Sequence, residues 1–317
     1  MDTHLVWVVG RSGLLGRALD RHLAGSAGTC LFAGARVPWD DAPAAVQTLC
    51  EDLDRFLAAA DGGRWSIFWA AGAGVIGSDP SLFERETAVL DGLVRALAAR
   101  ACSGRGAFFL ASSASVYAGH RLGPYDESTV PAPTSAYARA KLANEQVTSA
   151  ALSGRLPHVL GRISTLFGPG QDLTKNQGLV SKLCLQAVRR QTVQVFAPLD
   201  TLRDYLYVDD AAKLAAAFLA RAEDDGDLSS RVRHLSHGSA LSIGALTALV
   251  RQISHRRAGE LHVPPVDTAA HVRDLRVVSR YAHEVVGARR TTHEAGIRAT
   301  YADVLACYLR GDLAEVP

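Results

Sequence analysis

The chain lacks the features of several protein classes. Its five cysteines are scattered, odd in number and contain no C-x-x-C pair, which favours reduced thiols over disulfides or a zinc site. No apolar run approaches the roughly 18 residues of a membrane span, and no charged-then-apolar leader precedes the first apolar run, at residues 5–9. We therefore expect a cytoplasmic protein without a membrane partner.

The chain also lacks a large excess of positive or negative charge. The formal net charge is +2 and no block of like charges stands out, so we expect no nucleic-acid partner. His234 and His237 have the spacing of metal ligands, but no Cys, Asp or Glu completes a set, so we expect no metal. What is present is 317 residues, 48% of them hydrophobic, enough for a large core and two lobes.

A glycine turn follows the first apolar run. Apolar residues between Leu14 and Leu23 then recur at helical spacing, so the order is strand, turn, helix, the context that a dinucleotide site requires. The spacing is G-x-x-G-x-x-G, and the alternative is a glycine-rich turn in another α/β protein. We expect cofactor contacts from the whole turn: Gly10, Arg11, Ser12, Gly13, Leu14, Leu15 and Gly16.

The next strand, residues 30–33, bears on the type of cofactor. An NAD site would carry Asp or Glu near its end, but the first charged residue there is Arg36, and a guanidinium suits a 2′-phosphate. Arg11 could reach the same phosphate. The sequence therefore favours NADP over NAD. The alternative is that Arg36 is solvated and that Asp40 or Asp41 takes the acidic role.

Strands and helices continue to alternate. We expect helices over 44–60 and 81–101 and strands over 65–69 and 107–111, which predicts a Rossmann-type, doubly wound parallel sheet that binds ligands at the carboxyl ends of its strands. The small residues after the strand at 65–69 would let a cofactor lie against it: Ala70, Ala71 and Gly72.

The candidate catalytic residues lie near the middle of the chain. Ser113 follows the strand at 107–111, and Tyr137 and Lys141 are four apart on a helix that Ser135 could cap. Hydride transfer between a nicotinamide and an alcohol or ketone needs a group that moves the hydroxyl proton. A tyrosine can do this only if its pKa falls from about 10 toward neutrality, which requires about 4 kcal/mol of stabilisation of the phenolate. A lysine ammonium at ~4.5 Å supplies about 3–4 kcal/mol of this.

We therefore predict an acid–base unit of Ser113, Tyr137 and Lys141, in which the last two also contact the cofactor and Ser113 hydrogen-bonds the substrate oxygen. Lysine is rare in this chain, which has four, so one at this spacing is informative. The alternative is a purely structural Tyr/Lys pair.

These features resemble the extended short-chain dehydrogenase/reductase family, in particular its nucleotide-sugar epimerases, dehydratases and ketoreductases. The resemblance covers nearly the full length. It rests on the glycine turn, on residues 113–117, 137–141 and 162–170, and above all on residues 202–210. It implies a Ser/Tyr/Lys proton relay, a bound nicotinamide dinucleotide and a sugar linked to a nucleoside diphosphate.

Some positions depart from the family pattern. Thr165 stands where an Asn is usual, and an Asn of an earlier helix is replaced near Glu86. The 4,6-dehydratases of the family carry Asp-Glu where this chain has Ala114 and Ser115, which makes dehydration unlikely chemistry here. The segment before Trp65 is short of one strand, as in the NADP-linked reductases of the family.

The resemblance also implies how the substrate is held. Residues 1–168 and about 202–238 would form the NAD(P)-binding domain, and 169–201 with 239–317 a smaller mixed α/β substrate lobe. The expected substrate contacts are Ser113, Ser115, Thr165 and Arg203. Arg203 would bind the diphosphate; the alternative is an ion pair with Asp204. One arginine of the C-terminal tail could complete the diphosphate site, among Arg273, Arg276, Arg289 and Arg290.

The predicted function is an NADP(H)-dependent 4-ketoreductase of a nucleotide-activated sugar. The alternatives are an NAD-dependent 4-epimerase and a non-catalytic dinucleotide sensor. From the resemblance we also expect a homodimer, in which helices 84–101 and 136–153 pack with their mates as a four-helix bundle.

Overall fold

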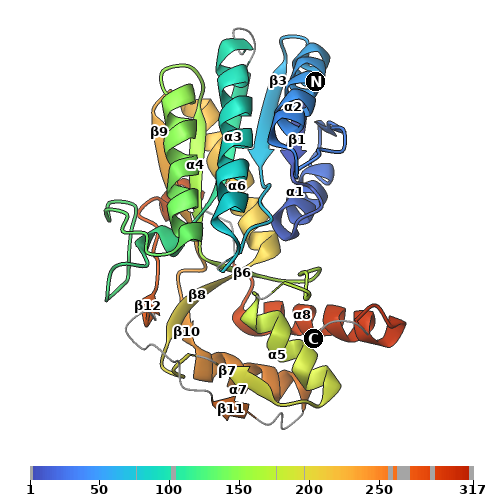
Figure 1. Cartoon of the computed structure of the whole chain (residues 1–317), viewed down its shortest axis with the longest axis vertical. Helices are drawn as coiled ribbons and strands as arrows, with labels where there is room; N and C mark the ends of the chain where they lie inside the picture. Colours follow the sequence, from blue (N-terminus) through green and yellow to red (C-terminus); the bar gives the residue numbers. More distant parts are fainter. Residues whose placement is uncertain are drawn as a thin grey trace.

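A parallel sheet with helices on both faces forms the upper lobe of the molecule (Figure 1). The computed structural model describes residues 3–75, 77–100, 105–175, 177–195, 197–255, 260–262, 272–285 and 290–313. The six-stranded sheet has the order β2-β1-β3-β4-β5-β9, and every neighbouring pair is parallel. The doubly wound fold predicted from the sequence is confirmed. The strands are β1 (His4–Val9), β2 (Thr29–Leu31), β3 (Arg64–Trp69), β4 (Arg105–Ser113), β5 (His158–Ile163) and β9 (Ser230–Leu235).

Two hydrophobic cores cover the two faces of this sheet. In β1, Val6 and Val8 face one core, while Leu5, Trp7 and Val9 face the other, so the strand is apolar throughout because both its faces are buried. The first core holds α1 (Leu14–Ala24) and α6 (Val208–Asp225). The second holds α2 (Ala42–Ala60), α3 (Pro80–Arg100) and α4 (Ala136–Leu152).

The lower lobe consists of shorter elements around a third core. Strand β8 lies between β10 and β12 and also pairs with β6, and β7 pairs with β11. The strands are β6 (Thr165–Phe167), β7 (Val193–Val195), β8 (Leu202–Tyr207), β10 (Ala240–Ser242), β11 (Glu260–His262) and β12 (Asp274–Leu275). Helices α5 (Leu179–Arg189), α7 (Ile243–Ser254) and α8 (His293–Arg310) pack together around this core, and the 3-10 turns are η1 (Ala114–Tyr117) and η2 (Ala282–Val285).

After β8 and α6 the chain returns to the main sheet, where β9 pairs with β5. The proposed division into two domains remains a prediction: β8, which it assigns to the cofactor domain, pairs with short strands of the lower lobe. Ala101, Cys102, Asn176, Phe196 and Arg289 lie outside the described residues. Within the described part of the chain, no helix is long and apolar enough to cross a membrane.

Two aspartates near the start of α6 do not cap it. The N-cap of α6 is Tyr207, and Asp209 and Asp210 lie inside the first turn. Asp210 accepts hydrogen bonds from the backbone N–H and the hydroxyl of Thr291, and Asp209 accepts one from Arg21 at 2.8 Å. Both carboxylates therefore connect α6 to other segments, which a local capping pattern cannot predict.

Candidate active site

Helix α4 places Tyr137 and Lys141 on one face at the carboxyl edge of the sheet. Its N-cap is Ser135, whose hydroxyl accepts the N–H of Ala138 at 3.1 Å, as the sequence predicts. The Lys141 ammonium is 5.6 Å from the centre of the Tyr137 ring and donates to the carbonyl of Ala111 in β4 at 3.4 Å. Only 9% of Lys141 is exposed, so its charge acts through little solvent.

Ser113 is the last residue of β4, two residues beyond the carbonyl that holds Lys141. Its hydroxyl oxygen accepts the N–H of Ser115 at 3.2 Å, which leaves the hydroxyl hydrogen to donate elsewhere. The hydroxyl of Ser115 is buried, and no described residue hydrogen-bonds it. This strand end therefore offers one hydroxyl that can donate to the oxygen of a ligand, that of Ser113, and holds beside it the buried, unpartnered hydroxyl of Ser115.

The glycine turn lies at the ends of β1 and β3. Gly10 has a φ of +86°, and a Cβ there would lie 2.5 Å from the backbone nitrogen of Ala71. A Cβ on Gly16 would lie 2.1 Å from the Gly10 carbonyl oxygen. Gly13 is the N-cap of α1 and provides no side-chain cap, so the first N–H groups of this helix remain available to an anion. The turn fits the pyrophosphate of a dinucleotide.

The other residues of the turn have more local contacts. The carbonyl of Ser12 accepts a hydrogen bond from Arg17 at 2.5 Å. Leu14 and Leu15, in the first turn of α1, pack against the first core. Arg11 forms an exposed ion pair with Asp20 at 2.9 Å, so its expected reach to a 2′-phosphate competes with this contact.

Arg36 lies exposed in the segment after β2, and no contact within the described chain engages its guanidinium. Next to it, the backbone N–H of Ala35 donates to the buried carboxylate of Asp52 at 2.7 Å, which fixes the path of this segment. Asp41 caps α2 by accepting the N–H of Ala44 at 3.0 Å. Of the candidate groups for the ribose, Arg36 and Asp40 are exposed and have no side-chain contact within the described chain, whereas Asp41 is engaged as the helix cap.

Thr165 and Arg203 lie below this edge, on the paired strands β6 and β8. Arg203 donates to the carbonyls of Leu202 at 2.8 Å and Val272 at 2.6 Å, and burial lowers the pKa of its guanidinium. The alternative ion pair with Asp204 is wrong, since no ion pair among the described residues joins them. Asp204 instead accepts from the Ser164 hydroxyl at 2.6 Å and from two backbone N–H groups.

The tail arginines that the structure describes have partners of their own. Arg276 pairs with Asp274 at 2.6 Å, and Arg273 lies 3.7 Å from Asp200. Arg290 donates to the carbonyl of Ser236 at 3.2 Å. Which of them completes a diphosphate site remains a prediction.

A buried polar network beneath the site was not predicted. Glu145, one turn after Lys141, forms an ion pair with Arg162 at 2.6 Å, and Arg162 also donates to the Tyr117 hydroxyl at 2.6 Å. That hydroxyl lies 2.7 Å from Nε2 of His234 in β9, and burial raises the pKa of Tyr117 to about 12. The network connects α4 to β5 and β9. The one sequence feature that could have predicted it is Glu145, a charged residue on the face of α4 that packs against the sheet.

Two further sequence features lie elsewhere. The ring nitrogens of His234 bond Tyr117 and the Val278 carbonyl, while the His237 ring stacks on His293 with centres 3.9 Å apart. No group of three or more metal-ligating side chains occurs in the described ranges.

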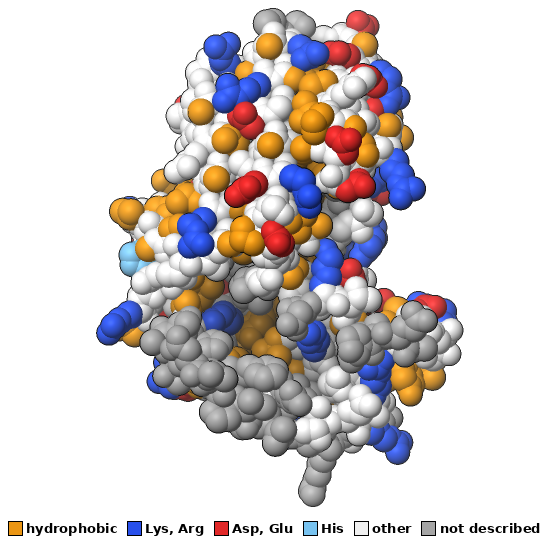
Figure 2. Space-filling model, in the orientation of Figure 1, with side chains coloured by type: hydrophobic (Ala, Val, Ile, Leu, Met, Phe, Trp, Pro, Cys, Tyr) orange, Lys and Arg blue, Asp and Glu red, His pale blue; other side chains and the backbone are white. Residues whose placement is uncertain are grey.

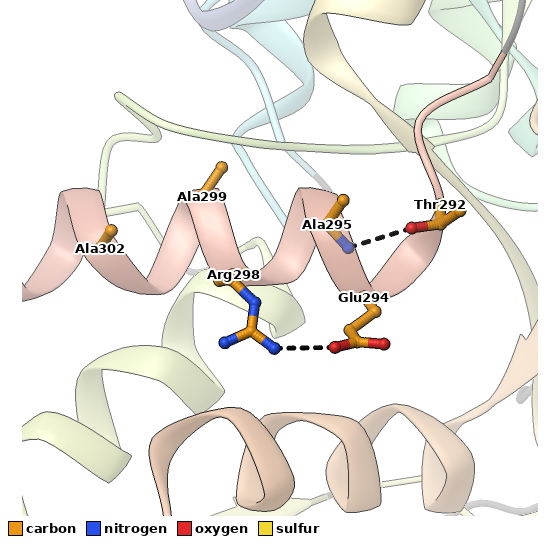
Figure 3. A pocket seen from close by; sticks show the side chains of 6 residues that line it. All are labelled: Thr292, Glu294, Ala295, Arg298, Ala299 and Ala302. Atoms are coloured by element: carbon orange, nitrogen blue, oxygen red, sulfur yellow. Dashed lines mark hydrogen bonds and ion pairs between the residues drawn. The ribbon is translucent and has the colours of Figure 1, made fainter.

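A surface hollow of about 530 Å³ lies on the first half of α8 (Figure 3). In it Glu294 and Arg298 pair at 2.7 Å and three alanines form the wall. None of the predicted site residues lines it, so the chemistry, rather than this hollow, locates the candidate site at the edge of the sheet.

Comparison with known proteins places this geometry in a family. The model of the "NAD dependent epimerase/dehydratase family" matches residues 6–229. The chain is 31% identical over 141 residues to dTDP-L-rhamnose 4-epimerase of Burkholderia thailandensis, a match of 38% of this chain and 39% of that protein. It is 27% identical over 239 residues to dTDP-6-deoxy-L-talose 4-dehydrogenase (NAD(P)(+)) of Kitasatospora kifunensis, covering 69% of this chain and 70% of that protein.

The fold is also similar to that of a solved structure, RMD from Pseudomonas aeruginosa complexed with NADPH. The TM-score is 0.77 at 23% identity, over 96% of this chain and 100% of that one. The first of the curated relatives is thus matched over less than half of its length, and the second over about two thirds.

Proposed function

The chain belongs to the NAD dependent epimerase/dehydratase family, and from this premise we propose that it is an NADP(H)-dependent oxidoreductase that reduces the 4-keto group of a nucleotide-activated sugar. One observation carries the proposal. Tyr137 and the buried Lys141 share a face of α4, and Lys141 is bonded to β4 two residues before Ser113. These are the groups that a carbonyl reduction needs beside a dinucleotide.

Each of these side chains has a defined part in the reaction. When bound, a nicotinamide dinucleotide would supply the hydride. Tyr137 donates its phenol proton to the substrate oxygen, and the Lys141 ammonium, near its ring, stabilises the phenolate that remains. Ser113 donates a hydrogen bond to the same substrate oxygen, because its own oxygen already accepts the Ser115 N–H.

The preference for NADP is supported by Arg36. Its guanidinium is exposed at the sheet edge where the adenosine ribose of a dinucleotide binds in this fold, and it can form charge-assisted bonds to a 2′-phosphate. The Gly10–Gly16 turn would hold the pyrophosphate at the start of α1.

The substrate class is supported by the relatives and by the departures of the sequence. Both curated relatives are named for dTDP-linked 6-deoxy sugars. Thr165, Ser115 and Arg203 would contact the substrate, with Arg203 at its diphosphate. Ala114 and Ser115 after Ser113 offer no carboxyl groups for the elimination of water, which supports a redox reaction instead.

A second candidate function is a 4-epimerase. It is favoured by the similarity to dTDP-L-rhamnose 4-epimerase. It would use the same residues to oxidise and re-reduce one carbon on opposite faces. The two reactions differ in their cofactor balance, because only the reductase consumes one NADPH for each product.

The test is to incubate the protein with NADPH and a dTDP-4-keto-6-deoxyhexose. We expect loss of NADPH absorbance in equal amount to the alcohol formed. An epimerase would instead convert dTDP-L-rhamnose to its 4-epimer with no net change in cofactor. No cofactor loss with any 4-keto sugar nucleotide would contradict the reductase.

We also propose a homodimer formed through α3 and α4. These helices lie side by side on the upper lobe, where small apolar side chains are spread between charged ones (Figures 1 and 2). Both helices belong to the proposed cofactor domain and lie on the upper lobe, so a dimer formed through them would leave the lower lobe uncovered. Light scattering should give twice the mass of one 33.7 kDa chain, and the mass of a monomer would contradict the proposal.

A further inference from the structure

A glutamate on α3 holds the loop that leaves β3. One carboxylate oxygen of Glu86 accepts the backbone N–H groups of Ala73 at 2.6 Å and Gly74 at 3.1 Å. This loop continues from Ala70, Ala71 and Gly72, the small residues expected to contact the cofactor. The position of the cofactor edge of β3 therefore depends on one side chain from the neighbouring helix.

The other oxygen of Glu86 lies near the catalytic lysine. A Cβ placed on Gly72 would lie 3.8 Å from this oxygen and 3.5 Å from the Lys141 ammonium nitrogen. The two charged groups are therefore no farther apart than the sum of these two distances, and both lie beside a residue without a side chain. Because Lys141 is buried, a carboxylate at this range offsets part of its positive charge.

The other charged groups around Lys141 are already engaged. On α4, Glu145 is neutralised by its ion pair with Arg162 at 2.6 Å. From the segment between β6 and α5, Lys175 reaches the same loop and donates to the Ala73 carbonyl at 3.2 Å. From β4 comes only the Ala111 carbonyl, and from α3 the apolar Phe83 packs on Tyr137 with ring centres 6.0 Å apart. No ion pair of the described residues involves Glu86.

We propose that Glu86 is a positioning residue of the active site, whose one oxygen fixes the cofactor loop and whose other oxygen weakens the pull of Lys141 on the Tyr137 phenol. This inference rests on the proposed function for the role of Tyr137 and Lys141. Its consequence is that Glu86 sets both how firmly the cofactor is held and the pH at which Tyr137 loses its proton.

Two substitutions separate these roles. Glu86→Gln keeps an oxygen that can accept both N–H groups but removes the charge, while Glu86→Ala removes both. Tyr137 ionisation is followed by ultraviolet absorbance of the phenolate, as the difference between each variant and the same variant carrying Tyr137→Phe. Cofactor affinity is followed by NADPH fluorescence. Glu84→Gln, an exposed change on the same helix, is the matched control.

We expect Glu86→Gln to move the Tyr137 titration down by about half a pH unit to one unit, with NADPH affinity within about twofold of the parent. Glu86→Ala should show the same movement and bind NADPH about tenfold more weakly, because two backbone donors lose their acceptor. Glu84→Gln should change neither quantity.

An unmoved titration in Glu86→Gln, or unchanged NADPH affinity in a folded Glu86→Ala, would overturn the inference. Both measurements need no sugar substrate, so they separate this inference from the proposed function. If no 4-keto sugar is reduced while the titration moves, the proposed function alone fails. If reduction occurs and Tyr137→Phe abolishes it while Glu86 has no effect, this inference alone fails.

Discussion

At the scale of the residue, two of the three candidate catalytic side chains are hydrogen-bonded to a backbone group of β4 or of the turn that follows it. Ser113 accepts the N–H of Ser115, and Lys141 donates to the Ala111 carbonyl. The residue types and their spacing predict this chemistry, because a phenol needs a nearby cation and a helix brings positions four apart together. Glu86 could not be found this way, since its contacts join a helix to a loop that no local pattern connects.

The proposed preference for NADP over NAD depends on Arg36. Arg36→Ser removes a permanent charge from the proposed site of the 2′-phosphate, so NADPH should bind about tenfold to a hundredfold more weakly while NADH affinity stays nearly unchanged. Calorimetric titration with both cofactors measures this. Arg11→Ser, which breaks an exposed ion pair, should have the smaller effect. Equal loss for NADPH and NADH in Arg36→Ser would count against the assignment.

At the scale of the element, the helices follow from their apolar spacing and caps, but the pairing of short strands does not. Ser135 caps α4 as its position predicts, and Ser242 caps α7 in the same way. The sequence of β8 mixes Arg203 and Asp204 with Leu and Tyr, and no local pattern in it shows that the strand pairs with β6, β10 and β12. Such pairings depend on contacts far apart in the chain, which local periodicity does not encode.

The attachment of α4 to the sheet gives a prediction of stability. Glu145→Gln leaves the Arg162 guanidinium buried without its counter-charge, so the free energy of unfolding should fall by about 3 kcal/mol. Urea denaturation at neutral pH measures the loss. The control is Glu294→Gln, which breaks the exposed i,i+4 pair on α8 and should cost less than about 0.5 kcal/mol. Equal costs would show that the buried pair does not hold α4.

At the scale of the whole molecule, partly buried histidines make stability depend on pH. Burial lowers the pKa of His293 to about 4, and burial together with Arg64 lowers that of His4 to about 4. In the unfolded chain both titrate near 6.5, so between these values the unfolded state binds more protons. The folded state therefore keeps its full contribution from these groups above pH 6.5 and loses it as the pH falls toward 4.

We expect the free energy of unfolding to fall by about one or two kcal/mol between pH 7 and pH 5 through these two partly exposed groups. Urea denaturation at both pH values measures the change. His293→Gln with His4→Gln should weaken the dependence, and part of it should remain because burial also lowers the pKa of His158. A double variant as pH-sensitive as the parent would contradict the assignment.

The sequence predicts the architecture of the upper lobe more completely than any other feature of the structure. Alternating apolar strands and amphipathic helices predict a parallel sheet, and the match to residues 6–229 agrees. The arrangement of the lower lobe is harder to predict from the sequence, because its strands are two to six residues long and show little hydrophobic periodicity.

The central claim is that Tyr137 moves the proton of a hydride-transfer reaction. The most direct measurement compares NADPH oxidation by the parent and by Tyr137→Phe with the same dTDP-4-keto-6-deoxyhexose, alongside NADPH binding. We predict that Tyr137→Phe lowers the rate by about 10²–10⁴-fold while NADPH binds within a few fold of the parent. A Tyr137→Phe variant that turns over at the rate of the parent would contradict the account.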